Sequence, residues 1–172
     1  MGLDCFITPH FDYVDSTLTH PRSREVRGFA AVGLVNPKTE GNIGGAMRAV
    51  GCYEARLIVI QGQRYKKMRE DTQKAWRHIP LLHCDLLDAV PQECEVVVVE
   101  LAEGAKPLTT FKHPERAFYI FGPEDGSVPK DIIERAKHVV QVPTKHCMNL
   151  AATVNVVLYD RLAKSQQEGP SK

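Results

Sequence analysis

The stretch NPKTEGNIGGAMR, residues 36–48, follows directly on the apolar run AAVGLV of residues 30–35. Two later stretches are built in the same way, FGPEDGSVP at 121–129 and VPTKHCMNL at 142–150, each at the end of an apolar run. Glycine and proline let the backbone of such loops approach a ligand closely, and the polar side chains supply the chemistry. We therefore expect the three loops to form one site.

Apolar runs rich in Val, Ile and aromatic residues predict five strands, at 30–35, 56–61, 95–101, 116–121 and 138–142. The runs are continuously apolar rather than alternating, which is typical of strands covered on both faces of a parallel sheet. Helices are predicted between and after them, at 43–50, 65–78, 86–90, 130–137 and 149–164. The alternation predicts a single α/β domain over 29–165, with an N-terminal arm at 1–28 and a flexible tail at 166–172.

The helix predicted at 43–50 carries the first group of candidate site residues. Asn42 stands where an N-cap is expected. Arg48 shares one face of this helix with Gly44 and Gly45, which have no side chains. We therefore expect another group to approach that face closely.

Composition limits the class of protein. With 172 residues and 43% hydrophobic content, the chain can bury a core without disulfides or metal, and a formal charge of +1 neither favours nor excludes nucleic acid. The cysteines are odd in number and contain no Cys-x-x-Cys pair, which argues against a disulfide framework and a zinc site and favours a reducing cytoplasm. Residues 1–16 include acidic side chains and no long apolar run, so neither a signal peptide nor a membrane anchor is expected.

Ligands of an open parallel sheet bind beyond the carboxyl ends of its strands, and the three loops follow strands in that sense. None of them contains a P-loop or a Gly-x-Gly-x-x-Gly fingerprint, so neither ordinary phosphate cradling nor dinucleotide binding is favoured. A different cofactor is expected.

In order and separation, the three loops resemble the signature motifs of the SpoU (TrmH-like) branch of the SPOUT class of RNA methyltransferases. The similar stretches are NIG at 42–44 with Arg48, FGPE at 121–124, and VP at 142–143 with CMNL at 147–150. The resemblance extends over about residues 30–164. In length the chain is similar to the compact TrmL-like tRNA methyltransferases, which modify the anticodon wobble nucleotide.

The resemblance implies a parallel-sheet SPOUT fold with a deep C-terminal trefoil knot and S-adenosylmethionine as cofactor. It also implies a homodimer and transfer of a methyl group to a ribose 2′-hydroxyl of RNA, with tRNA favoured, and no metal is expected. Periodicity alone predicts an unknotted doubly wound sheet, because chain connections rarely thread. Three alternatives stay open: an rRNA 2′-O-methyltransferase, a non-catalytic RNA-binding or assembly protein, and a small-molecule enzyme on an ordinary α/β sheet.

The resemblance assigns a catalytic role to Arg48, Asn42, Glu124 and Asn149. Arg48 matches the family residue that takes or stabilises the leaving proton; because arginine rarely loses its own proton, it acts either as a perturbed base or as a positioning charge. Glu124 either caps the helix after Pro129 or fixes the cofactor loop. For Asn149, which could equally cap the last helix, the resemblance favours the site.

The resemblance places the cofactor against Leu101, Gly122, Val142, Met148, Glu100 and Cys147. At Gly122 a side chain is expected to push into the pocket, and Cys147 is expected to form pocket wall rather than a nucleophile. The chain departs from the family at Ser127, where glycine is usual, and at Cys147, where serine is usual and is the better donor.

Basic side chains predict contacts with RNA phosphates. The candidates are Arg64, Lys66, Lys67, Arg69, Lys145 and His146. Such contacts predict an affinity for RNA that falls steeply with salt.

Overall fold

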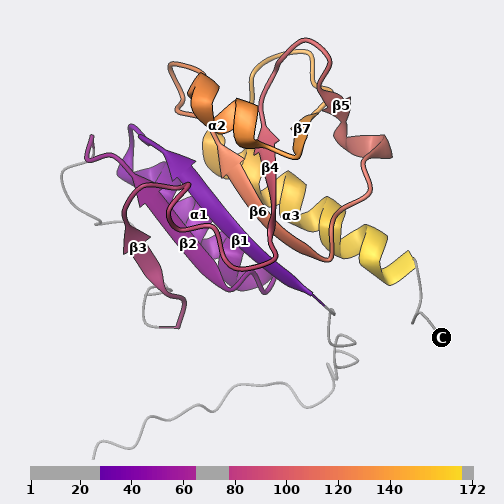
Figure 1. Cartoon of the computed structure of the whole chain (residues 1–172), viewed down its shortest axis with the longest axis horizontal. Helices are drawn as coiled ribbons and strands as arrows, with labels where there is room; N and C mark the ends of the chain where they lie inside the picture. The colour runs from indigo at the N-terminus through magenta and orange to yellow at the C-terminus, as the bar shows by residue number, and fades with distance from the viewer. Residues whose placement is uncertain (1–27, 65–77, 168–172) are drawn as a thin grey trace, which may run out of the picture.

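The structure is a computed structural model that describes residues 28–64 and 78–167 (Figure 1). The predicted helix at 65–78 lies almost wholly outside the described residues, as do Lys66, Lys67, Arg69 and nearly all of the predicted arm at 1–28.

A seven-stranded sheet, in which every pairing is parallel, forms the centre of the molecule, with strand order β3-β2-β1-β6-β4-β7-β5. The strands are β1 Phe29–Val35, β2 Leu57–Gln61, β3 Leu81–His83, β4 Glu95–Val99, β5 Lys106–Pro107, β6 Arg116–Phe121 and β7 His138–Gln141. The helices are α1 Glu40–Cys52, α2 Lys130–Arg135 and α3 Leu150–Gln167, with a short 3-10 helix, η2, at Leu108–Thr110. The predicted α/β fold with a parallel sheet is therefore confirmed.

The five predicted strands are all present, and their ends agree with the prediction to within two residues. The largest difference is in β4, which ends at Val99, so that Glu100 and Leu101 begin the loop that follows it. The strands β3 and β5 were not predicted. They have three and two residues and are mostly exposed, so they lack the apolar runs that identified the others.

The prediction of a helix at 86–90 is wrong, because these residues form turns. The segment is too short to hold a helix between Asp85, whose side-chain oxygen accepts a hydrogen bond from the Leu87 N–H, and Pro91. Its apolar character still has a structural role, since Leu86 is fully buried.

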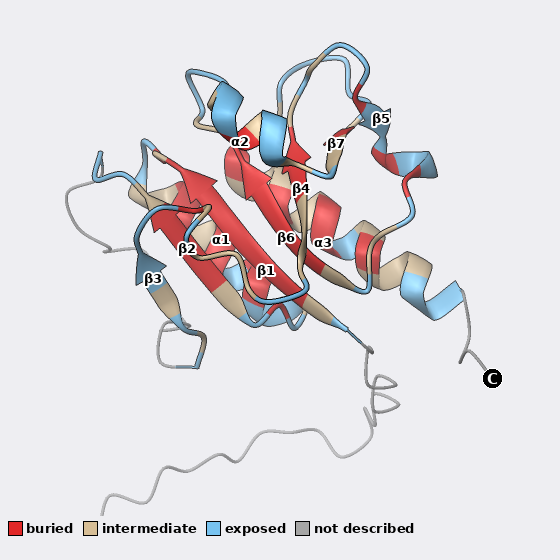
Figure 2. Ribbon diagram, viewed as in Figure 1, coloured by how far each residue is buried: buried red, intermediate tan, exposed pale blue. Residues whose placement is uncertain are grey.

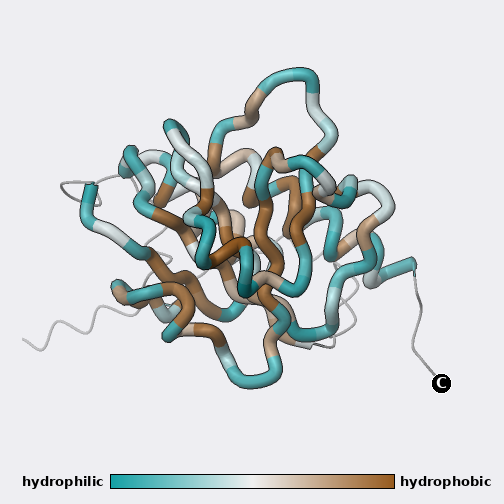
Figure 3. The backbone as a smooth tube through the Cα atoms, turned by 45° about the horizontal axis from the view of Figure 1, so that its top comes forward, coloured by the Kyte–Doolittle hydropathy of each residue, from teal (hydrophilic) through white to brown (hydrophobic). Residues whose placement is uncertain are grey.

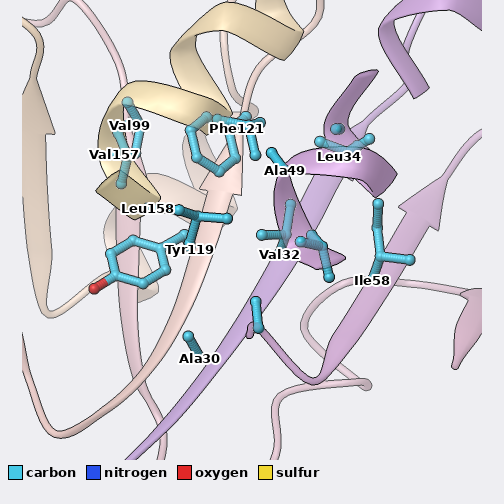
Figure 4. Close-up of a cluster of buried hydrophobic side chains, with 14 of the residues drawn as sticks. Ala30, Val32, Leu34, Ala49, Ile58, Val99, Tyr119, Phe121, Val157 and Leu158 are labelled. Carbon is cyan, nitrogen blue, oxygen red and sulfur yellow. The ribbon is translucent and has the colours of Figure 1, made fainter. Parts of the chain in front are cut away.

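Both faces of the sheet are covered, as the continuously apolar strands predicted (Figure 2). Alternate residues of β1 belong to different cores. Val32 and Leu34 pack with α1 and α3 on one face (Figure 4), whereas Ala31 packs with Leu86 and with Ile132 of α2 on the other. Figure 3 shows the same arrangement, with hydrophobic strands inside and hydrophilic loops around them.

The helices α1 and α3 approach each other unusually closely. A Cβ atom at Gly45 would lie 2.7 Å from the Cβ of Ala151, a distance that real Cβ atoms essentially never show. The close approach expected at the glycine face of α1 is therefore made, at Gly45, by α3 of the same chain. This contact sets the start of α3 beside the second turn of α1.

A polar cluster fastens α3 to the chain before β6. Arg161 is 8% exposed and donates to the carbonyl oxygens of Pro114, at 2.5 Å, and Glu115, at 2.7 Å. The helix then continues to Gln167, two residues into the range predicted for the tail. Glutamine is a good helix former, and no glycine or proline interrupts the chain before Gly169.

His113, a buried histidine that contacts Asp160 of α3, predicts that the protein loses stability in acid. Burial lowers the pKa of His113 despite its Asp160 partner, 2.8 Å away, and Arg161 and Lys164 act in the same direction as burial. The unfolded chain therefore binds a proton more readily than the folded one below pH ~6.5, and stability falls as pH drops through that value. Between pH 7.5 and pH 5, the free energy of unfolding measured with urea should decrease less for His113→Gln than for wild type. His78→Gln, at an exposed position, is the control, and equal decreases in all three proteins would contradict the assignment.

Candidate functional site

The site lies at the carboxyl edge of the sheet, where the loops after β1, β4, β6 and β7 meet. A pocket lies there. It is lined by Val99, Glu100, Leu101, Phe121, Gly122, Pro123, Glu124, Gly126, Gln141, Val142, Thr144, Cys147, Met148, Leu150 and Thr153. Its walls come from the second and third of the three loops, together with the end of β4 and the first turn of α3.

A chain of side-chain hydrogen bonds ties the three loops together. Asn42 Nδ2 donates to Glu124 Oε1 at 2.5 Å, and Asn42 Oδ1 accepts from Asn149 Nδ2 at 2.6 Å. Asn149 Oδ1 in turn accepts from the backbone N–H of Ala152, at 3.2 Å, in the first turn of α3. Asn149 thus acts both as a cap of α3 and as a link in this chain, so the two roles considered for it are combined.

The N-cap of α1 is Thr39 rather than Asn42, so the capping prediction for Asn42 is wrong. Thr39 Oγ1 accepts from the Asn42 N–H at 3.4 Å, and Asn42 lies in the first turn of the helix. The side chain of Asn42, 7% exposed, is thereby left for Glu124 and Asn149. Thr39 therefore caps the helix, and Asn42 connects the loops.

Glu124 anchors the start of α1 rather than capping α2, whose N-cap is Pro129, with no side-chain capping hydrogen bond. Its carboxylate accepts from the backbone N–H of Lys38 at 2.8 Å and of Thr39 at 3.4 Å. Burial acts to raise the pKa of Glu124, but these hydrogen bonds and that from Asn42 together lower it. The carboxylate therefore stays ionised at neutral pH, next to the positive end of the α1 dipole.

All six residues assigned to the cofactor line this one pocket: Glu100, Leu101, Gly122, Val142, Cys147 and Met148. Glu100 is held in place by the backbone, because Oε1 accepts from the Leu101 N–H at 3.0 Å and Oε2 from the Val128 N–H at 2.9 Å. It thereby connects the end of β4 to the loop after β6.

Gly122 makes room for that connection. A Cβ atom there would lie 3.2 Å from Glu100 Oε2 and 3.2 Å from the Val128 nitrogen, so a side chain would press on this hydrogen bond. A side chain at Gly122 was expected to push into the pocket, but the atoms nearest to its Cβ belong to Glu100 and Val128 in the pocket wall. At the departure from the family pattern, Gly126 lines the pocket and the exposed Ser127 does not.

Arg48 is not brought into the pocket. It is exposed on α1, three residues after Gly45 on the helix face that packs against α3, and it is absent from the pocket lining. The four residues predicted to be catalytic therefore fall into two groups. Asn42, Glu124 and Asn149 form the series of hydrogen bonds that fixes the loops, whereas Arg48 is exposed outside the pocket.

The described candidates for RNA contact lie around the site. Arg64 donates two hydrogen bonds to the Asp125 carboxylate, at 2.8 and 2.7 Å, which hold the pKa of Asp125 well below its usual range. Lys145 and His146 are exposed between Thr144 and Cys147, which line the pocket. Asp125 was not singled out from the sequence, because no spacing rule predicts its pairing with a residue 61 positions away.

Two further kinds of feature are absent from the described ranges 28–64 and 78–167. No group of His, Cys, Asp or Glu side chains there is placed to hold a metal ion. No helix in those ranges is both long and apolar enough to cross a membrane.

The model of the SpoU rRNA Methylase family matches residues 30–159, three quarters of the chain. The chain belongs to this family. The family resemblance of the three motifs is thereby confirmed. A search among curated proteins gave no match.

Solved structures share the fold at low sequence identity. The A. aeolicus TrmH/SpoU tRNA modifying enzyme has a TM-score of 0.72 and 16% identity, over 86% of this chain and 79% of its own. AviRb of Streptomyces viridochromogenes, a SpoU methyltransferase also solved with AdoMet, has a TM-score of 0.70 and 15% identity over 81% of this chain. A structure described as giving insights into 2-OH methylation of C/U34 on tRNA has a TM-score of 0.67 and 20% identity, over 81% of this chain and 92% of its own. The chain spans only 61% of the length of AviRb.

Proposed function

We propose that this chain is an S-adenosylmethionine-dependent RNA 2′-O-ribose methyltransferase that acts on tRNA. The observation that carries the proposal is the chain of hydrogen bonds from Glu124 through Asn42 to Asn149, which unites the three family motifs beside one pocket. Membership of a methylase family supports the chemistry, and a relative solved with AdoMet supports the cofactor.

The pocket fits such a cofactor. Leu101, Val142 and Met148 offer apolar surface for a flat base and an aliphatic chain, and the carboxylate of Glu100 suits a cation. When bound, S-adenosylmethionine supplies the methyl group. The chain's own task is to hold the pocket in shape, which the tied loops do.

Arg48 carries the charge that the reaction needs outside the pocket. In this proposal it binds the RNA next to the reacting ribose and stabilises the negative charge that develops on the 2′-oxygen. The exposed Lys145, His146 and Arg64 contact neighbouring phosphates, so affinity for RNA should fall as salt rises. The predicted trefoil knot, the homodimer and the cytoplasmic location belong to the same proposal.

Among RNA substrates, tRNA is favoured by two observations on relatives of similar fold. The structure described by 2-OH methylation of C/U34 on tRNA is covered over 92% of its length, and the A. aeolicus protein is described as a tRNA modifying enzyme. Ribosomal RNA is the second candidate, because the family is named for rRNA methylation.

The test is methyl transfer from labelled S-adenosylmethionine to bulk tRNA and to rRNA, followed by mass spectrometry of the nucleosides. We expect a 2′-O-methylnucleoside in tRNA. Label on a base would contradict the ribose assignment, and label in rRNA alone would move the substrate to the second candidate. Cofactor binding without transfer to either RNA, under conditions where a related enzyme is active, would favour the non-catalytic scaffold.

A further inference from the structure

The side chains that line the pocket carry charge of one sign. Among the residues that the structure describes, Glu100 and Glu124 are the charged residues of the lining, and no lysine, arginine or histidine belongs to it. The basic Arg64 and Lys145 are exposed and lie outside the lining. The pocket therefore attracts a cation, whereas its surroundings attract phosphate.

The two carboxylates differ in what they face. That of Glu124 is directed to the start of α1, where it binds Asn42 and the backbone N–H of Lys38. That of Glu100 stays in the wall between β4 and the loop after β6, and each of its oxygens accepts one backbone hydrogen bond. Because a carboxylate offers about four acceptor sites, two remain for a ligand.

We propose that Glu100 is a specificity-determining residue, which makes the pocket prefer the positively charged methyl donor over its neutral product. The inference rests on the proposed function. S-adenosylmethionine carries a sulfonium, an ammonium and a carboxylate, and so a net charge of +1. Loss of the methyl group turns the sulfonium into a thioether, and S-adenosylhomocysteine is neutral overall. A fixed, half-buried carboxylate thereby binds the donor more tightly and favours release of the product.

The test is calorimetric binding of three ligands to wild type and to Glu100→Gln. The ligands are S-adenosylmethionine, S-adenosylhomocysteine, and sinefungin, whose protonated amine keeps a positive charge close to the place of the sulfonium. In Glu100→Gln the Kd of both cationic ligands should rise about fivefold or more relative to that of S-adenosylhomocysteine, the factor expected for two unit charges ~4 Å apart in water. Glu103→Gln removes the same charge from an exposed position outside the pocket lining, and should leave the ratios unchanged.

Glu100 also holds two backbone N–H groups, so its replacement could weaken binding by loosening the wall. That effect would weaken all three ligands equally, and an unchanged ratio would overturn the inference while leaving the proposed function intact. Should Glu100→Gln fail to fold, wild type decides: sinefungin must bind more tightly than S-adenosylhomocysteine, and the reverse order overturns the inference. Failure of wild type to bind any of the three ligands is a separate result, which overturns the proposed function itself.

Discussion

Arg48→Ala is expected to lower kcat for RNA methylation by about 10²- to 10³-fold while leaving affinity for S-adenosylmethionine unchanged. The reason is the division of the site. Arg48 is exposed on α1 and does not line the pocket, so its removal leaves the pocket walls intact. What is lost, under the proposed function, is a permanent positive charge beside the ribose oxygen. The measurements are single-turnover methylation and calorimetric binding of the cofactor.

Two further variants separate charge from geometry at Arg48. Arg48→Lys keeps a positive charge but loses the planar fork, so partial activity indicates a positioning charge. Arg56→Ala removes an exposed arginine just before β2, at the opposite edge of the sheet, and should have no effect. Full activity of Arg48→Ala would show that the catalytic assignment is wrong, and loss of cofactor binding would show that Arg48 belongs to the pocket.

The core of the fold could be predicted because burial on both faces leaves a direct trace in the sequence. In β1, six of the seven residues are buried and the other is partly buried, which appears as one unbroken apolar run. The edge strands β3 and β5 leave no such trace, since their residues are mostly exposed. The segment at 86–90 shows the opposite error: it is apolar because Leu86 covers the sheet, and burial alone does not make a helix.

The candidate site could be predicted as a set of residues but not as a set of contacts. Spacing placed the N-cap of α1 at Asn42, whereas Thr39 caps the helix and the Asn42 side chain binds Glu124, 82 positions beyond it. Likewise Glu100 was expected near the cofactor. Its hydrogen bond from the Val128 N–H could not be predicted, because it forms only once β4 and β6 pair in the sheet. Loop composition identifies the participants, and the strand order decides which of them touch.

Asn42→Ala is expected to impair both cofactor binding and turnover, because this side chain joins all three loops. Its loss leaves Glu124 Oε1 with only the longer hydrogen bonds from Thr39, at 3.4 Å, and takes the Asn42 acceptor from Asn149 Nδ2, at a cost of about 1–3 kcal/mol in free energy of unfolding. A loop shift of ~1 Å then lowers kcat by about 10²-fold. Thermal unfolding, calorimetry and methylation rates measure the three effects.

The matched control is Asn155→Ala, since the Asn155 amide donates to the Ala151 carbonyl of its own helix and joins no loop. Asn42→Asp keeps the shape of the side chain but sets a second carboxylate against Glu124, so it should be at least as damaging as alanine. Because Asn42 and Asn149 act in one chain, their alanine variants should be strongly non-additive, with a coupling energy of about 0.5–3 kcal/mol. Additive effects, or an active Asn42→Asp, would contradict the view that one chain of hydrogen bonds holds the site together.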